Sequence, residues 1–194
     1  MIKLKVGDVV VEPTIGICTV EGVRRMKIDQ TEEDYYIFQS GNTKVLVPKG
    51  EVEKRGIRKP MSKEEVKKIF SLLKVPVTPN RSDAKMQYLS YREIMKSGDP
   101  QKITKLLRDL YTLDQTDELK GKEKEIMEQA RKFLCDEITY IKGQSKTKVI
   151  EDINESLRAM YKKKIAKERE KAKKSQQLSS SPMPPIPPPD SLID

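Results

Sequence analysis

The chain changes from strand-like to helix-like sequence at residues 61–73, which read MSKEEVKKIFSLL. Ser62 and Glu65 have the spacing of a capping box, in which two side chains satisfy free N–H groups at the first turn of a helix. Four apolar residues follow at i, i+3, i+4 and i+7, namely Val66, Ile69, Phe70 and Leu73. This spacing places them on one helix face, so we predict a helix that ends before Pro76.

The sixty residues before this point are predicted to form short strands. Turn signals such as Gly7-Asp8 and Gly41-Asn42 separate β-branched and aromatic runs. The runs are Val9–Val11, Ile15–Val20, Tyr35–Phe38 and Val45–Val47. Their length and spacing predict a small curled sheet or partly open barrel. Because Pro48 cannot donate a hydrogen bond to a ladder, we predict that the strand before it, Lys44–Val47, is an edge strand.

Four further helices are predicted after Pro76 from the helical spacing of apolar side chains. The second begins near Ser82 or Asp83 and ends at Ser97-Gly98, the third begins after Asp99, the fourth runs from about Lys122 to Lys142, and the fifth begins at Ser145. Pro100 suits the first position of the third helix, and Gly143 suits the end of the fourth. The predicted fold class is therefore α+β, with a small β-barrel in residues 1–60 and a five-helix domain in residues 61–160.

The C-terminal part lacks the composition of a folded core. Residues 161–174 contain eight Lys and Arg against two Glu, and we predict that they form a basic helical extension. Residues 175–194 are rich in serine and hold six of the twelve prolines. We therefore expect a disordered tail there. Taken alone, the basic run fits either a solvated helix face or a contact with DNA phosphates.

Composition excludes most catalytic machinery. The 194 residues carry 39 Lys+Arg against 30 Asp+Glu, a net charge of +9, and contain no histidine and no tryptophan. Without histidine there is no Ser-His-Asp or Cys-His nucleophile and no His-ligated metal. Cys18 and Cys135 form no CxxC motif, and the glycines form no phosphate loop. We expect no enzyme, no cofactor and no metal site, with a carboxylate-only Mg²⁺ site left as the alternative.

The same residues indicate the compartment. No apolar run approaches the ~18 residues that a membrane span needs. Two unpaired cysteines fit a reducing cytoplasm, although pairing between Cys18 and Cys135 is left open. We therefore expect a cytoplasmic protein that does not enter a membrane.

Cations and aromatic side chains occur together at the start of the second predicted helix. They are Arg81, Lys85, Tyr88, Tyr91 and Arg92. Cations at a helix N-terminus can bind a phosphate. Tyr88 and Tyr91 fall on the apolar face, and we expect them to pack in the core. Charge, composition and periodicity together indicate a basic, two-part protein for which nucleic-acid binding is one open alternative.

A set of motifs occurs in a fixed order along residues 1–160. The first half has Val6-Gly7-Asp8-x-Val10, Tyr35-Tyr36, Val45-x-Val47-Pro48 and Gly56-x-Arg58. The second half has Ser97-Gly98-Asp99, Arg108-Asp109-Leu110 and Ala130-Arg131-x-x-Leu134-x-x-Glu137. Together they resemble the CarD/CdnL family of bacterial transcription regulators. Residues 161–194 lie outside this resemblance.

The resemblance implies a Tudor-like N-terminal module that binds the RNA polymerase β subunit, as in transcription-repair coupling factors. It also implies a helical domain that contacts upstream promoter DNA and stabilises the open complex. We accordingly expect a nucleoid-associated protein, and we expect it to be a monomer. The implied polymerase-binding residues are Arg25, Met26, Lys44, Val45, Leu46, Val47 and Pro48. Arg25 and Met26 are expected to flank the strand. The alternative for Val45 and Val47 is that both face the barrel interior, which backbone pairing by the strand would still allow.

One family feature is absent. Family members typically have a tryptophan wedge and a basic cluster at the start of the second helix, where this chain has Ala84, Lys85 and Met86. Alanine cannot replace an indole wedge. We expect DNA contact mainly through phosphates, from Arg81 and Lys85 and from the added basic run with Lys162, Lys163 and Lys164. Two alternatives stay open: Met86 or a tyrosine takes part of the wedge role, or the chain is a free-standing basic DNA-binding or nucleoid-associated protein that does not require polymerase.

Overall fold

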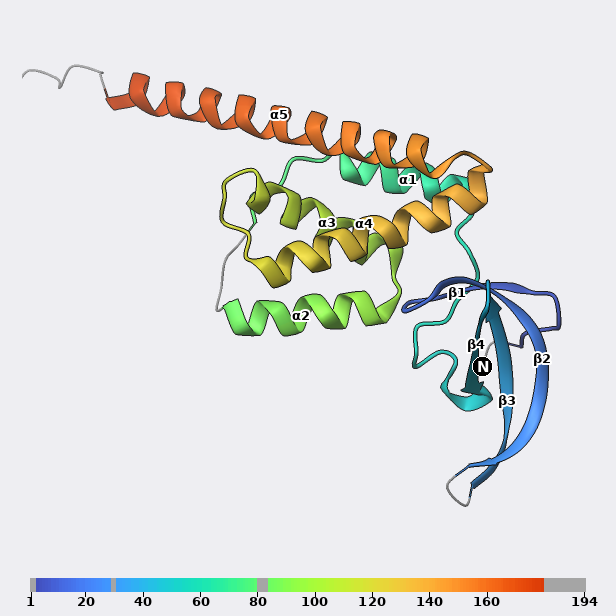
Figure 1. Cartoon of the computed structure of the whole chain (residues 1–194). Helices are drawn as coiled ribbons and strands as arrows, with labels where there is room; N and C mark the ends of the chain where they lie inside the picture. Colours follow the sequence, from blue (N-terminus) through green and yellow to red (C-terminus); the bar gives the residue numbers. More distant parts are fainter. Residues whose placement is uncertain (1–2, 29–30, 80–83, 180–194) are drawn as a thin grey trace, which may run out of the picture.

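The structure is a computed structural model that describes residues 3–28, 31–79 and 84–179. A curled four-stranded antiparallel sheet is followed by five α-helices, which confirms the predicted α+β class (Figure 1). The strands lie in the order β1 (Val9–Glu12), β2 (Gly16–Ile28), β3 (Thr31–Ser40) and β4 (Thr43–Pro48). A short 3-10 helix, η1 (Lys49–Glu51), comes directly after β4.

The sheet is a half-barrel with its own apolar core. Val10, Phe38 and Val47 have no exposed surface and pack on its concave side with Cys18. The turn between β3 and β4 is Gly41-Asn42, and Gly41 has a φ of 55°. Two-residue hairpin turns of this kind need a positive φ at the first position, which glycine adopts without strain. The sequence signal at this turn therefore fixes the register between β3 and β4.

The helices are α1 (Lys63–Leu73), α2 (Ala84–Ser97), α3 (Pro100–Asp114), α4 (Gly121–Lys142) and α5 (Lys146–Ser179). The predicted capping box is present, because the Ser62 hydroxyl accepts from the Glu65 N–H (3.1 Å) and the Glu65 carboxylate accepts from the Ser62 N–H (2.7 Å). Asp99 caps α3, and Gly143 ends α4 with a φ of 63°. Local signals thus set most of the helix boundaries.

Helix α3 lies at the centre of the helical domain. Its Leu107 and Leu110 are fully buried and belong to one core with residues of α1, α4 and α5. The buried stripe of α5 consists of Val149, Ile153, Leu157 and Met160, each without exposed surface. The stripe ends at Met160, so the packed part of α5 is its first half. None of the helices in the described ranges is long and apolar enough to cross a membrane.

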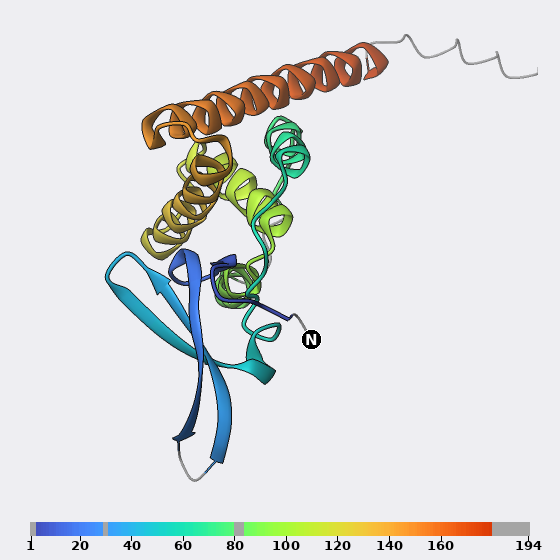
Figure 2. The ribbon, with the colours of Figure 1, turned by 90° about the vertical axis from the view of Figure 1, so that its right-hand side faces the viewer.

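The second half of α5 continues beyond the domain as an exposed helix. Figures 1 and 2 both show it projecting past the other helices. Residues 166–173 are all exposed. Helix α5 ends at Ser179, four residues past the start of the predicted tail at Ser175, and residues 180–194 lie outside the described residues. We call residues 161–179 the basic arm.

The two cysteines are free and lie in different cores, Cys18 in the sheet and Cys135 in α4. Burial, assisted by the neighbouring Glu12 carboxylate, raises the pKa of the Cys18 thiol from 9.0 to about 11. Burial also raises the pKa of the Cys135 thiol. Since the thiolate is the reactive species, both thiols are protected in the folded chain at neutral pH.

We expect both thiols to react at least ~100-fold more slowly with a thiol reagent at pH 8 in the folded protein than in urea. The pKa of the Cys18 thiol is higher in the folded chain, about 11, than its ordinary value of 9.0. The contribution of this thiol to the free energy of unfolding is therefore complete below pH 9 and is lost as the pH rises towards 11. Rapid labelling of the native protein at pH 8 would contradict this prediction.

Candidate protein and nucleic-acid interfaces

The outer side of β4 is an open sheet edge. Strand β4 is last in the strand order and pairs with β3, and among the described residues no strand pairs with its other side, which confirms the predicted edge strand. The two-residue turn makes Ser40 and Thr43 a hydrogen-bonded pair. Bonding then alternates along β4, so the N–H groups of Lys44 and Leu46 point away from β3. Pro48, which has no N–H, falls in this outward set.

The side chains of β4 divide between the two faces of the sheet. Val47 is fully buried and Val45 packs against the same core, so both face the interior of the half-barrel. Leu46 lies on the opposite face with 41% of its surface exposed. Lys44 Nζ lies 2.6 Å from Glu21 Oε1, in an ion pair that is about half exposed and therefore worth about 0–1 kcal/mol. The outer backbone and the exposed side chains of Thr43, Lys44 and Leu46 are therefore accessible to a partner.

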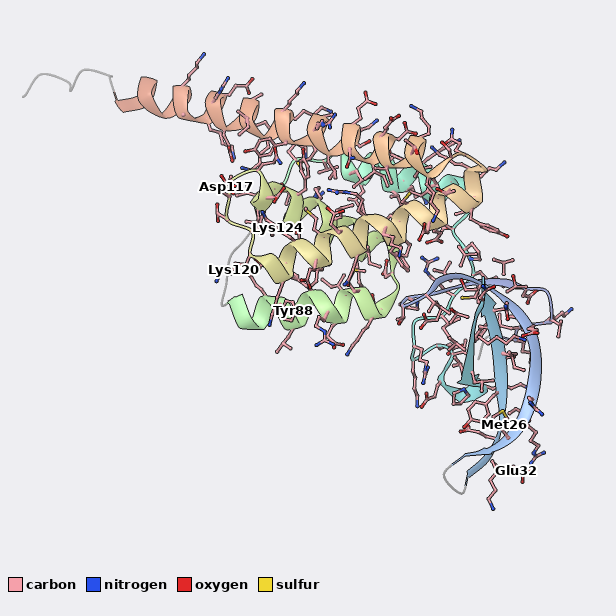
Figure 3. All side chains as sticks on the ribbon, in the orientation of Figure 1. Met26, Glu32, Tyr88, Asp117, Lys120 and Lys124 are labelled. Carbon is pink, nitrogen blue, oxygen red and sulfur yellow. The ribbon has the colours of Figure 1, made fainter. Side chains whose placement is uncertain are left out.

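Arg25 and Met26 lie elsewhere on the sheet. They pair with Asp34 and Glu33 on β3, beyond the position where β4 ends opposite Tyr35. Because β3 runs between β2 and β4, the two residues do not directly flank β4. Figure 3 shows Met26 near the far end of the β2–β3 hairpin, which projects away from the helices.

The projecting part of this hairpin has one basic and one acidic strand. We call it the ribbon; its β2 side carries Arg24, Arg25 and Lys27, and its β3 side carries Glu32, Glu33 and Asp34. Arg25 Nε lies 3.3 Å from Glu32 Oε1 across the strands. Sequence reasoning missed this arrangement because it depends on pairing between strands. A partner lying along the ribbon meets cations at one side and carboxylates at the other, which favours one orientation.

Arg58 connects the sheet to the helical domain. Its guanidinium donates two hydrogen bonds of 2.7 Å to the two carboxylate oxygens of Glu137 on α4. Its Nε donates to the carbonyl of Gly98, between α2 and α3, at 2.7 Å. The Glu137 side chain is 1% exposed, and it also accepts from the Met61 N–H at 2.7 Å. Sequence reasoning noted Arg58 and Glu137 as motif residues without assigning them a role.

Two glycines allow the domains to approach closely beside this ion pair. Gly56 has a φ of 70°, and a Cβ placed on it would lie 2.5 Å from the carbonyl oxygen of Ser97. Gly98 has a φ of 62°, and its Cβ would lie 2.8 Å from the carbonyl oxygen of Gly56 and from Pro13 Cγ. Both positions therefore require glycine for conformation and for space. The Gly56-x-Arg58 and Ser97-Gly98 motifs meet at this junction.

A groove of about 510 Å³ lies beside the junction. It opens between the β1–β2 turn, α2 and α4, and its lining includes Ile15, Arg92, Met95, Lys132 and Phe133. The two domains are thus not packed together across their whole facing surfaces. Their direct contact includes the glycines, the ion pair and an apolar contact in which Val11 and Ile17 of the sheet pack against the helical core.

The start of α2 is the predicted DNA-contacting position. Arg81 lies outside the described residues, and only the backbone is described for Ala84, Lys85 and Met86, in the first turn of α2. Tyr88 and Tyr91 pack against the helical core as partly buried side chains, in accordance with the expectation. Figure 3 shows Lys120 and Lys124, around the α3–α4 loop, at the same end of the domain as the start of α2.

The three predicted lysines of the basic arm differ in their surroundings. Lys162 and Lys163 are exposed. The Lys164 side chain is 11% exposed, pairs with Glu168 at 2.9 Å and lies 5.8 Å from the centre of the Tyr161 ring. Lys162 and Lys163 are therefore accessible to a phosphate, whereas Lys164 already has a carboxylate partner.

Arg108, a motif residue, has a structural role. Its guanidinium lies 3.4 Å and 3.3 Å from the carbonyl oxygens of Leu72 and Val75, at the end of α1. Burial raises the pKa of the neighbouring Asp109, and the Arg108 charge opposes this shift.

No group of three or more His, Cys, Asp or Glu side chains within the described part of the chain is arranged to hold a metal ion.

Comparisons with known proteins divide the chain at the same junction. Residues 4–61 match the sequence model of the CarD-like/TRCF RID domain, and residues 68–154 match that of the CarD C-terminal domain. A protein of Bacillus subtilis (strain 168), named "Putative transcription factor YdeB", is 23% identical over 141 residues, which cover 72% of this chain and 92% of that protein. The basic arm lies beyond the residues that the two domain models match.

Proposed function

This chain belongs to the CarD-like family of transcription factors, and we propose that it binds the RNA polymerase β subunit through its sheet and upstream promoter DNA through its helical domain. It would thereby change the lifetime of the open complex without catalysing a reaction. The observation that carries the proposal is the open edge of β4, with its outward N–H groups and exposed Leu46.

An open edge of this kind supports pairing with a strand of a partner. Main-chain hydrogen bonds provide the affinity in such pairing, and side chains beside the edge provide the specificity. Leu46 supplies an apolar contact at the edge, and Lys44 supplies a cation. The side chains of Val45 and Val47 pack against the core and their N–H and C=O groups face β3, so we propose that these two residues support the edge without bonding to the partner strand. Arg25 and Met26 would make a separate contact through the ribbon.

Substitution of Leu46 tests the proposed edge contact. Leu46→Pro removes an outward N–H without removing a β3–β4 hydrogen bond, and Leu46→Asp places a charge in the apolar contact. We expect each to weaken capture of the purified polymerase β fragment at least ~10-fold. Val6→Asp is the matched control, because Val6 is 68% exposed and lies before β1. Capture at the wild-type level by both Leu46 variants would contradict the proposal.

For the DNA contact we propose a phosphate-binding surface formed by the start of α2 and the basic arm. Both point away from the sheet in Figure 1. Ala84 stands where the family resemblance places a tryptophan, so we propose that phosphate contacts from Arg81, Lys85 and the arm replace much of the wedge. Cations that neutralise phosphates supply affinity without sequence preference.

The salt dependence of DNA binding tests the arm. If Lys162 and Lys163 each contact a phosphate, changing both to glutamine should reduce the log–log salt slope of duplex binding by about 1.8. Lys67→Gln with Lys68→Gln is the matched control, because these two exposed neighbours lie on α1. An unchanged slope would exclude the arm from the DNA contact. Strong, arm-dependent DNA binding without any polymerase capture would favour the free-standing DNA-binding alternative.

A further inference from the structure

We propose that Arg58 and Glu137 act as a positioning pair that fixes the angle between the sheet and the helical domain, so that anchoring the sheet on polymerase sets where the start of α2 meets DNA. The inference rests on the proposed function. It assigns the pair a role in coupling the two binding surfaces, separate from contact with either partner.

Arg58 joins three elements at one point. Its backbone pairs with Val11 on β1, with N–H···O distances of 2.8 Å and 3.2 Å. Its side chain reaches the Gly98 carbonyl and the Glu137 carboxylate. The sheet edge, the α2–α3 corner and α4 are therefore connected through a single residue.

The geometry of the pair restricts rotation as well as separation. A bidentate arginine–carboxylate pair has two parallel hydrogen bonds, which define a plane and not merely a distance. Glu137 is held from a third direction by the Met61 N–H, and the Arg58 guanidinium lies 5.9 Å from the centre of the Phe133 ring. A lysine at position 58 would keep the charge and lose this planar constraint.

The rest of the junction restrains the angle between the domains less directionally. Domains move relative to each other by default unless their interface is large and apolar. Here a groove separates part of the facing surfaces, and the glycine contact is a backbone approach. Val11 and Ile17 of the sheet also pack against the core of the helical domain, but apolar contact of this kind is non-directional. The ion pair is thus the contact best suited to hold the angle.

The position of the pair gives it leverage over the DNA end of α2. Helix α2 has 14 residues and runs from Ala84 to Ser97, next to Gly98 at the junction. Its far end is about 21 Å away at 1.5 Å per residue. A change of ~10° at the junction would therefore move the start of α2 by about 4 Å, which is more than the length of a hydrogen bond.

The test is the double variant Arg58→Met with Glu137→Leu, which replaces the pair by apolar side chains and leaves no buried charge unpaired. The matched control is Arg55→Met with Glu51→Leu, since this Arg–Glu pair is about half exposed and lies within the sheet domain. Interdomain distances are measured between spin labels introduced at Lys54 and Lys122, both exposed. Cys18 and Cys135 are too buried to be labelled.

In the Arg58/Glu137 double variant we expect the width of the distance distribution to increase about twofold or more. Capture of the β fragment and binding of duplex DNA, measured separately, should stay within about twofold of the wild type, because both surfaces are distant from the pair. The increase in open-complex lifetime should fall at least ~5-fold, since the two contacts no longer act at a defined spacing. The Arg55/Glu51 control should behave as the wild type in all three measurements.

Either of two results would overturn the inference: an unchanged distance distribution, or a wild-type effect on open-complex lifetime despite a broadened one. The proposed function fails in a different way, namely if the wild-type chain captures no β fragment or has no effect on the open complex. Arg58→Lys adds a graded comparison, and we expect its distance distribution to lie between those of the wild type and the double variant.

Discussion

Changing Arg58 to methionine alone is expected to lower the free energy of unfolding by about 3–5 kcal/mol, because it leaves a buried carboxylate without its cation. The Glu137 side chain is 1% exposed. In the variant it would lose both hydrogen bonds from Arg58 and keep the hydrogen bond from the Met61 N–H. Methionine fills much of the volume of the arginine side chain, so the loss reports the broken pair and not a cavity.

Urea unfolding of a double-mutant cycle measures this effect. Adding Glu137→Leu to Arg58→Met should recover most of the lost stability, because the unpaired charge is then removed. Arg55→Met is the control for a partly exposed pair and should change the unfolding free energy by no more than about 1 kcal/mol. A loss below about 1 kcal/mol for Arg58→Met would mean that water or another cation reaches Glu137.

Gly56→Ala is expected to cost about 3 kcal/mol or more of stability. The new Cβ would lie 2.5 Å from the Ser97 carbonyl oxygen, which is backbone and cannot rotate away. The positive φ of 70° adds a conformational cost of about 1–2 kcal/mol for a residue with a side chain. The two domains would have to separate locally, which would also strain the nearby Arg58–Glu137 pair.

Gly143→Ala separates the conformational cost of a positive φ from the steric cost of the close approach to Ser97. Gly143 has a φ of 63°, close to that of Gly56, and a Cβ on it meets nothing within 4 Å. Its substitution should therefore cost only the conformational term, about 1–2 kcal/mol, in the same thermal or urea unfolding experiment. Equal losses for the two variants would contradict the close approach at the domain junction.

Sequence patterns predicted the elements of the fold because their causes are local. The Ser62 and Glu65 capping box, Gly143 and the Gly41-Asn42 turn act within a few residues of themselves. Pro48 identified β4 as an edge strand for the same reason, since the missing N–H belongs to the strand itself.

The contacts that join the two domains could not be predicted in this way. Arg58 and Glu137 are 79 residues apart, and although both stand in the quoted motifs, nothing in a single sequence pairs one with the other. The placement of Arg25 and Met26 also depends on a non-local feature, because the β2–β3 register shifts at a bulge between Val20 and Gly22. One extra residue there changes the face on which every later side chain lies.

Helix α5 extends past the residue at which composition begins to indicate disorder. Around Ser175 the sequence is poor in apolar side chains, with only Ala172 and Leu178 nearby, and composition therefore indicated disorder. Helical continuation needs no core, however, when a packed helix precedes it and i,i+4 pairs such as Lys164–Glu168 support it.

The division of α5 into a packed half and an exposed half has a thermodynamic consequence. Starting a helix is costly, whereas extending one adds a hydrogen bond for each residue fixed. Residues 146–160 are held by the core and act as a permanent nucleus, so the arm only propagates from Met160 outward. Warming would shorten the arm gradually from its free end while the domain stays intact. Polyanion binding would lengthen it again, and circular dichroism could follow the exchange as a change in helix content well below the unfolding transition.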